Sequence, residues 1–284
     1  MNRSVFDAKT ISPATHRGDP EVLKYKPRSV AGQSQTTPAT RVAVFVYGVA
    51  AYALFLVTFL YAYGWVGNLF VPSSIDSQPS GDILVALTID FVLLALFAMQ
   101  HSLMARPFFK KWLTRVVPQP AERSTYVLAS SLALIAMFVF WRPLGGMVWN
   151  VDHEIARVAL YSTCALGWLI VLGTTFLINH FDLFGLRQVW LFLRGRPYTP
   201  LRFVTPLPYR MVRHPLYVGW LLAFWCTPTM SASHLIFAIA TTCYILIAIQ
   251  LEERDLIAQH PEYAEYRKRV PMLVPKFPPA RSSA

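Results

Sequence analysis

The chain has 284 residues, of which 55% are hydrophobic and 14% are charged, and its formal net charge is +11. It contains several apolar runs of about 20 residues, the length that an α-helix needs to cross a bilayer core, and these argue against a soluble globular protein. The positive charge does not indicate a nucleic-acid partner, because the basic residues form no stripe with interleaved aromatic side chains away from the membrane flanks.

The first feature in chain order is a polar segment over residues 1–41. It contains Pro13, Pro20, Pro27 and Pro38 together with many Ser, Thr and Gly residues, and it lacks the apolar core of a signal peptide. We expect a flexible cytoplasmic tail here.

Residues 42–180 carry four apolar segments that are apolar on most faces rather than along one stripe. A membrane-spanning segment must satisfy its own backbone hydrogen bonds, so these segments are predicted to be helices. The sequence thus predicts a four-helix transmembrane bundle with spans at Val42–Trp65, Ile83–Ala105, Thr125–Trp141 and Ile155–Asn179.

Residues 181–284 are predicted to form a cytoplasmic loop, a membrane hairpin and a C-terminal segment. Pro228 and nearby Ser residues interrupt the apolar region Leu216–Leu251, which indicates a turn between two helical arms. The segment Phe184–Arg194 suits either a helix in the membrane interface or a simple linker. The predicted fold class is an all-α integral membrane protein with four transmembrane helices, a C-terminal helical hairpin and a short cytoplasmic helix.

The basic residues define a topology. Only Arg142 and Arg157 fall on the side reached after the first and third spans. This is the positive-inside pattern, which predicts that both termini of this multi-pass membrane protein lie in the cytoplasm. The same residues would attract anionic lipid headgroups, so the lipid bilayer is an expected partner and no protein partner is inferred.

With this topology, four chain segments bring ionisable or amide side chains to the inner boundary of the membrane. Such groups mark a functional site by default, although interfacial snorkelling explains any one of them alone. They are His101, Asn179, His180, Arg213, His214, Glu252 and Glu253. We take His101, His180 and Asn179 as the catalytic candidates.

Asp90 lies eleven residues before His101, about three helical turns, so both are predicted to share a face of the second span. A protonated Asp90 bonded to a neighbouring helix is at least as plausible as a catalytic role.

The sequence RHPLYVG predicts that a helix begins at Pro215, where a missing N–H is tolerated. The helix dipole beside Arg213 and His214 would favour an anion, while Arg213 alone reads more simply as a headgroup anchor. Gly219 permits close approach of a ligand or of another helix.

The C-terminal segment offers an acidic and an aromatic feature. Glu252 and Glu253 could face a cation or ribose hydroxyls, and Tyr263 and Tyr266 could form one aromatic wall. An ordinary amphipathic surface helix is the simpler explanation of the tyrosines. The three cysteines are widely spaced in apolar segments, so neither a disulfide framework nor a metal site is expected.

Taken in order, RHPLYVG, EERDL and EYAEYRKRVPMLVP resemble the C-terminal cofactor region of the isoprenylcysteine carboxyl methyltransferase superfamily of membrane enzymes. The stretches QHSLMARPFFKKW, ERSTYVL and NHFDLFGLRQVW are similar to the branch that includes NnrU-like proteins and bacterial methanethiol S-methyltransferases. The resemblance covers about residues 42–276.

The resemblance implies S-adenosyl-L-methionine as cofactor, held between the hairpin and the C-terminal segment, and a small thiol, methanethiol, as substrate. The cofactor contacts that it implies are Arg213, His214, Pro215, Tyr217, Gly219, Glu252, Glu253, Tyr263, Tyr266 and Arg267. Two alternatives stay open at this point: an NADPH-dependent membrane reductase of the sterol-reductase type, and a non-enzymatic transporter or accessory protein.

A thiol must react as the thiolate, so a base by its side would help, and His101, His180 and His214 are candidates by type and depth. A pocket for so small a thiol should be narrow and dry. The side chains expected to line it are Phe97, Met99, Leu103, Phe176 and Trp220.

Overall fold

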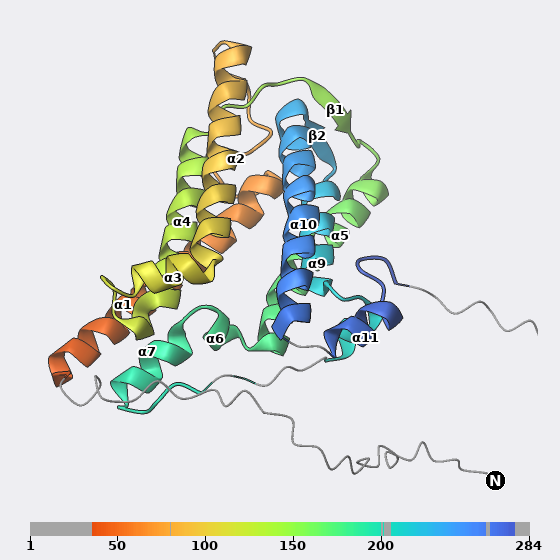
Figure 1. Cartoon of the computed structure of the whole chain (residues 1–284). Coiled ribbons are helices and arrows are strands. Elements are labelled where there is room, and N and C mark those ends of the chain that lie inside the picture. The colour runs from red at the N-terminus through yellow and green to blue at the C-terminus, as the bar shows by residue number, and fades with distance from the viewer. Residues whose placement is uncertain (1–35, 80, 200, 202–205, 260–261, 276–284) are drawn as a thin grey trace, which may run out of the picture. The chain divides into compact units, whose positions relative to one another are not determined.

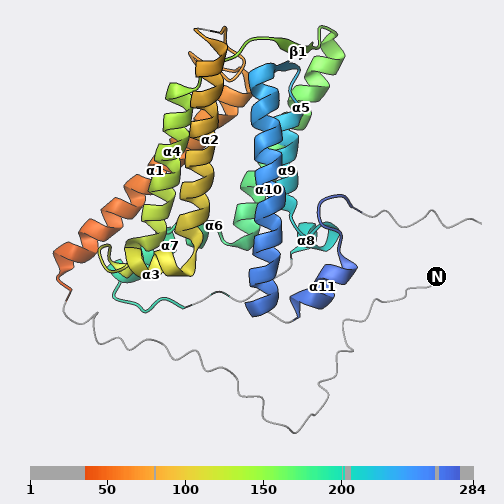
Figure 2. The ribbon, with the colours of Figure 1, turned by 45° about the horizontal axis from the view of Figure 1, so that its top comes forward.

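The computed structural model describes residues 36–79, 81–199, 201, 206–259 and 262–275. Its long helices run between two ends of the bundle, and short helices gather at one end (Figures 1 and 2). The helices are α1 Pro38–Gly67, α2 Ile83–Ala105, α3 Pro107–Leu113, α4 Glu122–Phe140, α5 Glu154–Ile178, α6 His180–Leu183, α7 Leu186–Leu193, α8 Leu207–Met211, α9 Pro215–Trp225, α10 Ala232–Gln259 and α11 Tyr263–Arg269.

Within the described residues, five helices are long and apolar enough to cross a membrane: α1, α2, α4 with the turn before it, α5 and α10. The prediction of a helical membrane protein is confirmed, and the four predicted spans agree with α1, α2, α4 and α5 to within a few residues. The fifth long helix differs from the expectation of four spans plus a hairpin, because the second arm of the supposed hairpin has 28 residues.

Local sequence explains where these helices begin and end. The Thr37 hydroxyl accepts a hydrogen bond from the Thr40 N–H at 3.3 Å, and Pro38 occupies the first turn, so α1 begins at Pro38. Helix α1 therefore begins three residues before the predicted tail boundary at residue 41, and residues 1–35 of that tail lie outside the described part of the chain. Asp82 caps α2 by accepting from the N–H groups of Leu84 and Val85.

The fold also contains a small sheet, which the all-α prediction did not include. Strand β1 (Met147–Asn150) pairs antiparallel with β2 (Thr229–Ser231), so the turn between α9 and α10 lies beside the α4–α5 connection. We call this the strand end of the bundle, and the end that carries α11 the α11 end. Helix α9 has only 11 residues. Beyond its end, an extended segment and β2 continue the chain to the strand end.

The helices form two groups. Helix α4 packs against α1 and α2, while α9 packs along α5. The second contact is close because two glycines face each other, and a Cβ on Gly219 would lie 2.8 Å from the Gly167 carbonyl oxygen. Gly219 thus serves helix packing, the second of its two predicted roles.

Asp76 fixes the loop between α1 and α2 to the strand end. Burial raises the pKa of Asp76, but bonds and charge from His234, with bonds from Ser231 and Asn68, outweigh burial and lower it. Its ionised form therefore contributes stability above about pH 4, the ordinary aspartate pKa, and this stability is lost as pH falls through the lower folded-state pKa.

We expect Asp76→Asn to lower the midpoint of thermal unfolding in detergent at pH 7, because it removes this contribution. The difference between the unfolding midpoints of wild type and variant should narrow as pH falls below about 4, where the wild-type carboxylate becomes protonated and loses its charge. Differential scanning calorimetry across this range measures both midpoints. A gap that stayed constant down to the lowest pH would contradict the charged state of Asp76.

Candidate functional site

A cavity of about 520 Å³ lies between the two groups of helices. It is lined by α1, α2 and α4 on one side and by α5, α9 and α10 on the other, and it follows one face of α10 from Phe237 to Leu256. Its volume falls within the usual range for small-molecule sites, roughly 300–1,000 Å³. The part toward the strand end is aromatic, and its lining includes Trp65, Phe138, Trp168, Trp220, Phe224 and Phe237.

His101 and Tyr126 line the cavity toward the α11 end. The Tyr126 hydroxyl lies 2.8 Å from His101 Nε2, and the Ser130 hydroxyl lies 3.3 Å from His101 Nδ1. Phe97 stacks on the imidazole with ring centroids 5.3 Å apart. The imidazole is thus held at both nitrogens and on one face, as a group that takes part in proton transfer requires.

Polar pairs surround the mouth of the cavity. Tyr217 donates to Glu252 Oε2 at 3.2 Å, and the hydroxyl groups of Ser102 and Tyr244 lie 3.0 Å apart. Arg106 on the far side of the mouth pairs with Asp255 at 3.2 Å. Two carboxylates and three hydroxyls therefore stand where the cavity opens.

Glu253 points away from the cavity into an ionic cluster. Its Oε1 accepts from Arg213 Nε at 2.7 Å and lies 3.0 Å from His214 Nε2, while its Oε2 lies 3.1 Å from Arg267 Nε. The Glu253 side chain is 2% exposed. Burial and this carboxylate raise the pKa of Tyr263, whose hydroxyl donates to Glu253 Oε1 at 3.4 Å. We call these five residues the Glu253 cluster.

The Glu253 cluster docks the C-terminal segment onto the start of α9. The Arg213 and His214 N–H groups donate to the carbonyls of Pro271 and Met272, at 2.8 and 3.2 Å, and Arg213 Nη1 donates to the Val270 carbonyl. The remaining tyrosine of the predicted aromatic wall, Tyr266, donates to the Tyr209 carbonyl at 2.5 Å. Neither Tyr263 nor Tyr266 lines the cavity.

The implied cofactor residues therefore divide into separate sets. Tyr217 and Glu252 line the cavity, and the Glu253 cluster lies behind them. Pro215 occupies the first turn of α9 and is buried, as the RHP pattern predicted for the start of a helix. Gly219 packs against α5.

The other two catalytic candidates lie away from the cavity. Thr175 donates its hydroxyl hydrogen to the Leu172 carbonyl, so His180 Nδ1 donates to Thr175 at 2.7 Å and His180 Nε2 accepts from Tyr52 at 2.7 Å. Burial lowers the pKa of His180, which keeps the ring neutral. Asn179 caps α6 by accepting from the Asp182 N–H at 3.2 Å. Both side chains are occupied in joining helices.

Three of the five residues predicted to line a thiol pocket do not line this cavity. Phe97 and Trp220 line the cavity, but Met99 and Leu103 lie on the opposite face of α2 and are 62% and 44% exposed. The helical period explains this, since residues 94, 97 and 101 share the cavity face. Phe176 stacks on His180 at 4.1 Å instead.

Asp90 is buried at a helix junction toward the strand end. Its Oδ1 accepts from the Arg142 N–H at 2.8 Å, just after the end of α4. This contact agrees with the structural alternative, a bond to a neighbouring helix.

Tyr126 was missed by sequence reasoning. It lies in ERSTYVL as the fifth residue of α4, at the depth where candidate polar groups were expected. A search that included tyrosine hydroxyls at that depth would have found it.

The fold and the cavity define an integral membrane protein that encloses a small-molecule site between two groups of helices. No protein-family model matches the chain, and no solved structure matches it. Over 237 residues it is 57% identical to the methanethiol S-methyltransferase of Crocosphaera subtropica, covering 83% of this chain and 93% of that protein. It is 50% identical over 236 residues to the methanethiol S-methyltransferase of Mycobacterium tuberculosis, covering 83% and 97%.

A more distant relative is the nurim of Xenopus laevis, 34% identical over 176 residues that cover 59% of this chain and 61% of that protein. The chain therefore belongs to the methanethiol S-methyltransferase family, and it is accordingly a methyltransferase. The reductase and the non-enzymatic alternatives are not favoured by these relatives.

Proposed function

We propose that the protein transfers a methyl group from S-adenosyl-L-methionine to methanethiol and releases dimethyl sulfide. The relatives named for this reaction cover most of the chain, and the cavity offers a site for it. The observation that carries the proposal is that a His–Tyr pair faces an apolar cavity whose mouth is acidic.

The residues present fit a sulfonium cofactor. A methyl bound to positively charged sulfur is the electrophile that this cofactor supplies. Aromatic faces of Tyr217 and Trp220 can stabilise such a cation, and Glu252 provides a negative charge at the mouth. Glu252 and Tyr217 are the residues of this chain that we assign to holding it. The Glu253 cluster supports them by fixing the start of α9.

His101 is assigned to proton transfer. The methanethiol proton passes to His101 Nε2, directly or through the Tyr126 hydroxyl, as the thiol sulfur forms its bond to the methyl carbon. Transfer of the methyl group would leave the cofactor sulfur as a neutral thioether, and His101 later releases the proton to water. The apolar walls exclude water, and they would orient the thiol sulfur for in-line attack on the methyl group.

The α11 end is assigned to the cytoplasmic side, with both chain termini there. Arg142 and Arg157 are associated with the strand end, whereas Arg106, Lys110 and Arg213 lie at the α11 end. This distribution follows the positive-inside rule and favours the bacterial inner membrane as the location. The mouth of the cavity then opens toward the water-soluble cofactor, while methanethiol can reach the site from the bilayer.

We expect the purified protein to bind S-adenosyl-L-methionine and its demethylated product and not to bind NADPH. Isothermal titration in detergent measures the affinity for each of the three ligands. Glu252→Gln should weaken the affinities for S-adenosyl-L-methionine and for its demethylated product, because it removes the negative charge at the mouth. Serine in place of Asp152, an acidic residue at the strand end, is the matched control and should leave them unchanged. Binding of NADPH alone would support the reductase alternative instead.

A further inference from the structure

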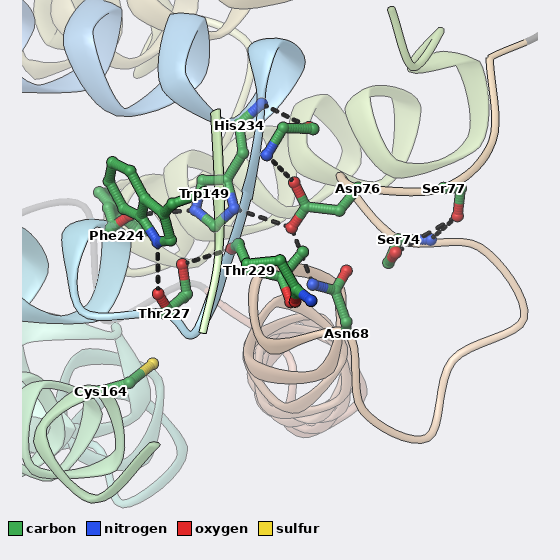
Figure 3. Close-up of polar contacts among 12 residues, drawn as sticks. Asn68, Ser74, Asp76, Ser77, Trp149, Cys164, Phe224, Thr227, Thr229 and His234 are labelled. Carbon is green, nitrogen blue, oxygen red and sulfur yellow. Dashed lines mark hydrogen bonds and ion pairs between the residues drawn. The ribbon is translucent and has the colours of Figure 1, made fainter. Parts of the chain in front are cut away.

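A buried polar network at the strand end joins the loop between α1 and α2 to the end of α9 and the start of α10 (Figure 3). Asp76 accepts from the Ser231 N–H at 2.8 Å, from Asn68 Nδ2 at 2.8 Å and from His234 Nδ1 at 2.9 Å. The side chains of Asp76 and His234 are 3% and 0% exposed. Neither residue lines the cavity or touches the groups assigned to the reaction.

The second nitrogen of His234 faces the end of α9. His234 Nε2 lies 3.0 Å from the Phe224 carbonyl oxygen, which belongs to the last turn of the helix, where carbonyls lack partners within the helix. Carboxylate and carbonyl oxygens only accept, so the imidazole donates from both nitrogens.

Phe224 is part of the cavity floor, which we define as Trp65, Phe224 and Phe237. The rings of Phe224 and Phe237 are 5.0 Å apart, and those of Trp65 and Phe237 are 5.5 Å apart. The Asp76–His234 pair is connected to each of these three floor residues through the backbone. His234 bonds the Phe224 backbone and lies one turn before Phe237.

Trp65 is held from the Asp76 side. The residue before Asp76, Ile75, donates its N–H to the Trp65 carbonyl at 3.1 Å and is itself fully buried. One ion pair therefore ties α1, α9 and α10 together just behind the three rings.

We propose that Asp76 and His234 are positioning residues that hold this floor in place and thereby limit the length of thiol that the cavity accepts. The inference rests on the proposed function. One additional methylene in a well-packed apolar pocket changes specificity by about 10- to 200-fold. Discrimination by chain length therefore requires a rigid floor. Loss of the ion pair lets the three rings shift and admits longer alkyl chains.

The test compares kcat/KM for methanethiol with kcat/KM for 1-propanethiol, by headspace detection of dimethyl sulfide and methyl propyl sulfide. Wild type should strongly prefer methanethiol. In His234→Gln and in Asp76→Asn the ratio of the two values should fall by about tenfold or more. A purely structural role predicts fewer folded molecules and the same ratio.

Asn150→Ala is the matched control, because Asn150 also makes a polar contact at the strand end, to Thr229 at 3.2 Å, without touching the floor. It should keep the wild-type ratio. An unchanged ratio in both His234→Gln and Asp76→Asn, or an equal fall of the ratio in Asn150→Ala, would overturn the inference.

Phe237→Leu tests the same idea from the floor itself. This variant should lower the ratio with the ion pair intact, and its effect should not add to that of His234→Gln, because both act on one structure. Strictly additive effects would contradict the inference.

If His234→Gln does not fold, Asn68→Ala provides a milder variant, because it removes one hydrogen bond to Asp76. It should lower the ratio by less than His234→Gln would. A wild-type ratio in Asn68→Ala then overturns the inference. If wild type forms no sulfide from any thiol, the proposed function fails and the inference falls with it.

Discussion

Replacement of His101 by alanine is expected to lower kcat for methanethiol by about 10²- to 10⁴-fold at neutral pH, the range for loss of a general base. His101 faces the cavity and is held by Tyr126 and Ser130, and no other histidine among the described residues lines the cavity. Cofactor affinity should change little, since the residues assigned to the cofactor come from α9 and α10.

The pH profile separates a base from a packing residue. The thiolate fraction in solution rises with pH, so the deficit in kcat of His101→Ala should narrow at high pH if the lost group was a base. A packing defect would give the same deficit at every pH. Tyr126→Phe should cause a smaller loss of kcat, because it removes the hydroxyl that joins the imidazole to the cavity.

His180→Gln is the matched control for His101→Ala. Glutamine can both donate to Thr175 and accept from Tyr52, as neutral His180 does, and the residue lies away from the cavity. Turnover per folded molecule should therefore stay near the wild-type value. Loss of turnover in His180→Gln together with full activity in His101→Ala would reverse our assignment of the base.

The second large effect is expected from Glu253→Gln. Glu253 is buried against Arg213, His214 and Arg267, and removing one partner of a buried ion pair typically costs about 3–5 kcal/mol because the other charges lose their compensation. The C-terminal segment should detach from α9, since Arg213 would no longer be held where it bonds to Val270. The five long apolar helices do not depend on these contacts and should remain inserted.

Limited proteolysis with trypsin measures this detachment, because Arg267, Lys268 and Arg269 lie in α11. A local cost of about 3 kcal/mol corresponds to cleavage faster by more than a hundredfold when opening and reclosing are fast relative to cleavage. Glu252→Gln is the neighbouring control. The Glu252 side chain is 48% exposed, accepts a hydrogen bond from Tyr217 and lies 3.9 Å from His214 Nδ1, a distance beyond hydrogen bonding, so cleavage should change little. Equal cleavage rates in wild type and Glu253→Gln would show that the Glu253 cluster does not dock the segment.

Helix positions were predictable from the sequence because length and hydropathy suffice to locate a membrane-spanning helix. Pro215 marked the start of α9 correctly for the same kind of local reason. The second hairpin arm was underestimated because Pro228 and Ser residues indicate a turn but do not show how far α10 continues beyond it. The β1–β2 pairing joins segments about 80 residues apart, which no local pattern reports.

The site was predictable as a depth in the membrane and less so as a set of contacts. His101 and Glu252 were found because charge at the membrane boundary is costly. The same rule also selected His180, which does not line the cavity. Its two hydrogen bonds, to Tyr52 and Thr175, depend on the packing of α1 against α5. Asp76 and His234 were missed because each looks like an ordinary loop or turn residue until the fold brings them within 2.9 Å.

The most direct test of the central claim follows the methyl group itself. Purified protein in lipid nanodiscs receives S-adenosyl-L-methionine with a deuterated methyl group and unlabelled methanethiol, and the headspace is analysed by mass spectrometry. We predict dimethyl sulfide with one deuterated and one ordinary methyl group, in a one-to-one ratio with S-adenosylhomocysteine, and only trace product from His101→Ala at neutral pH. Absence of labelled dimethyl sulfide from wild-type protein that binds the cofactor would contradict the account.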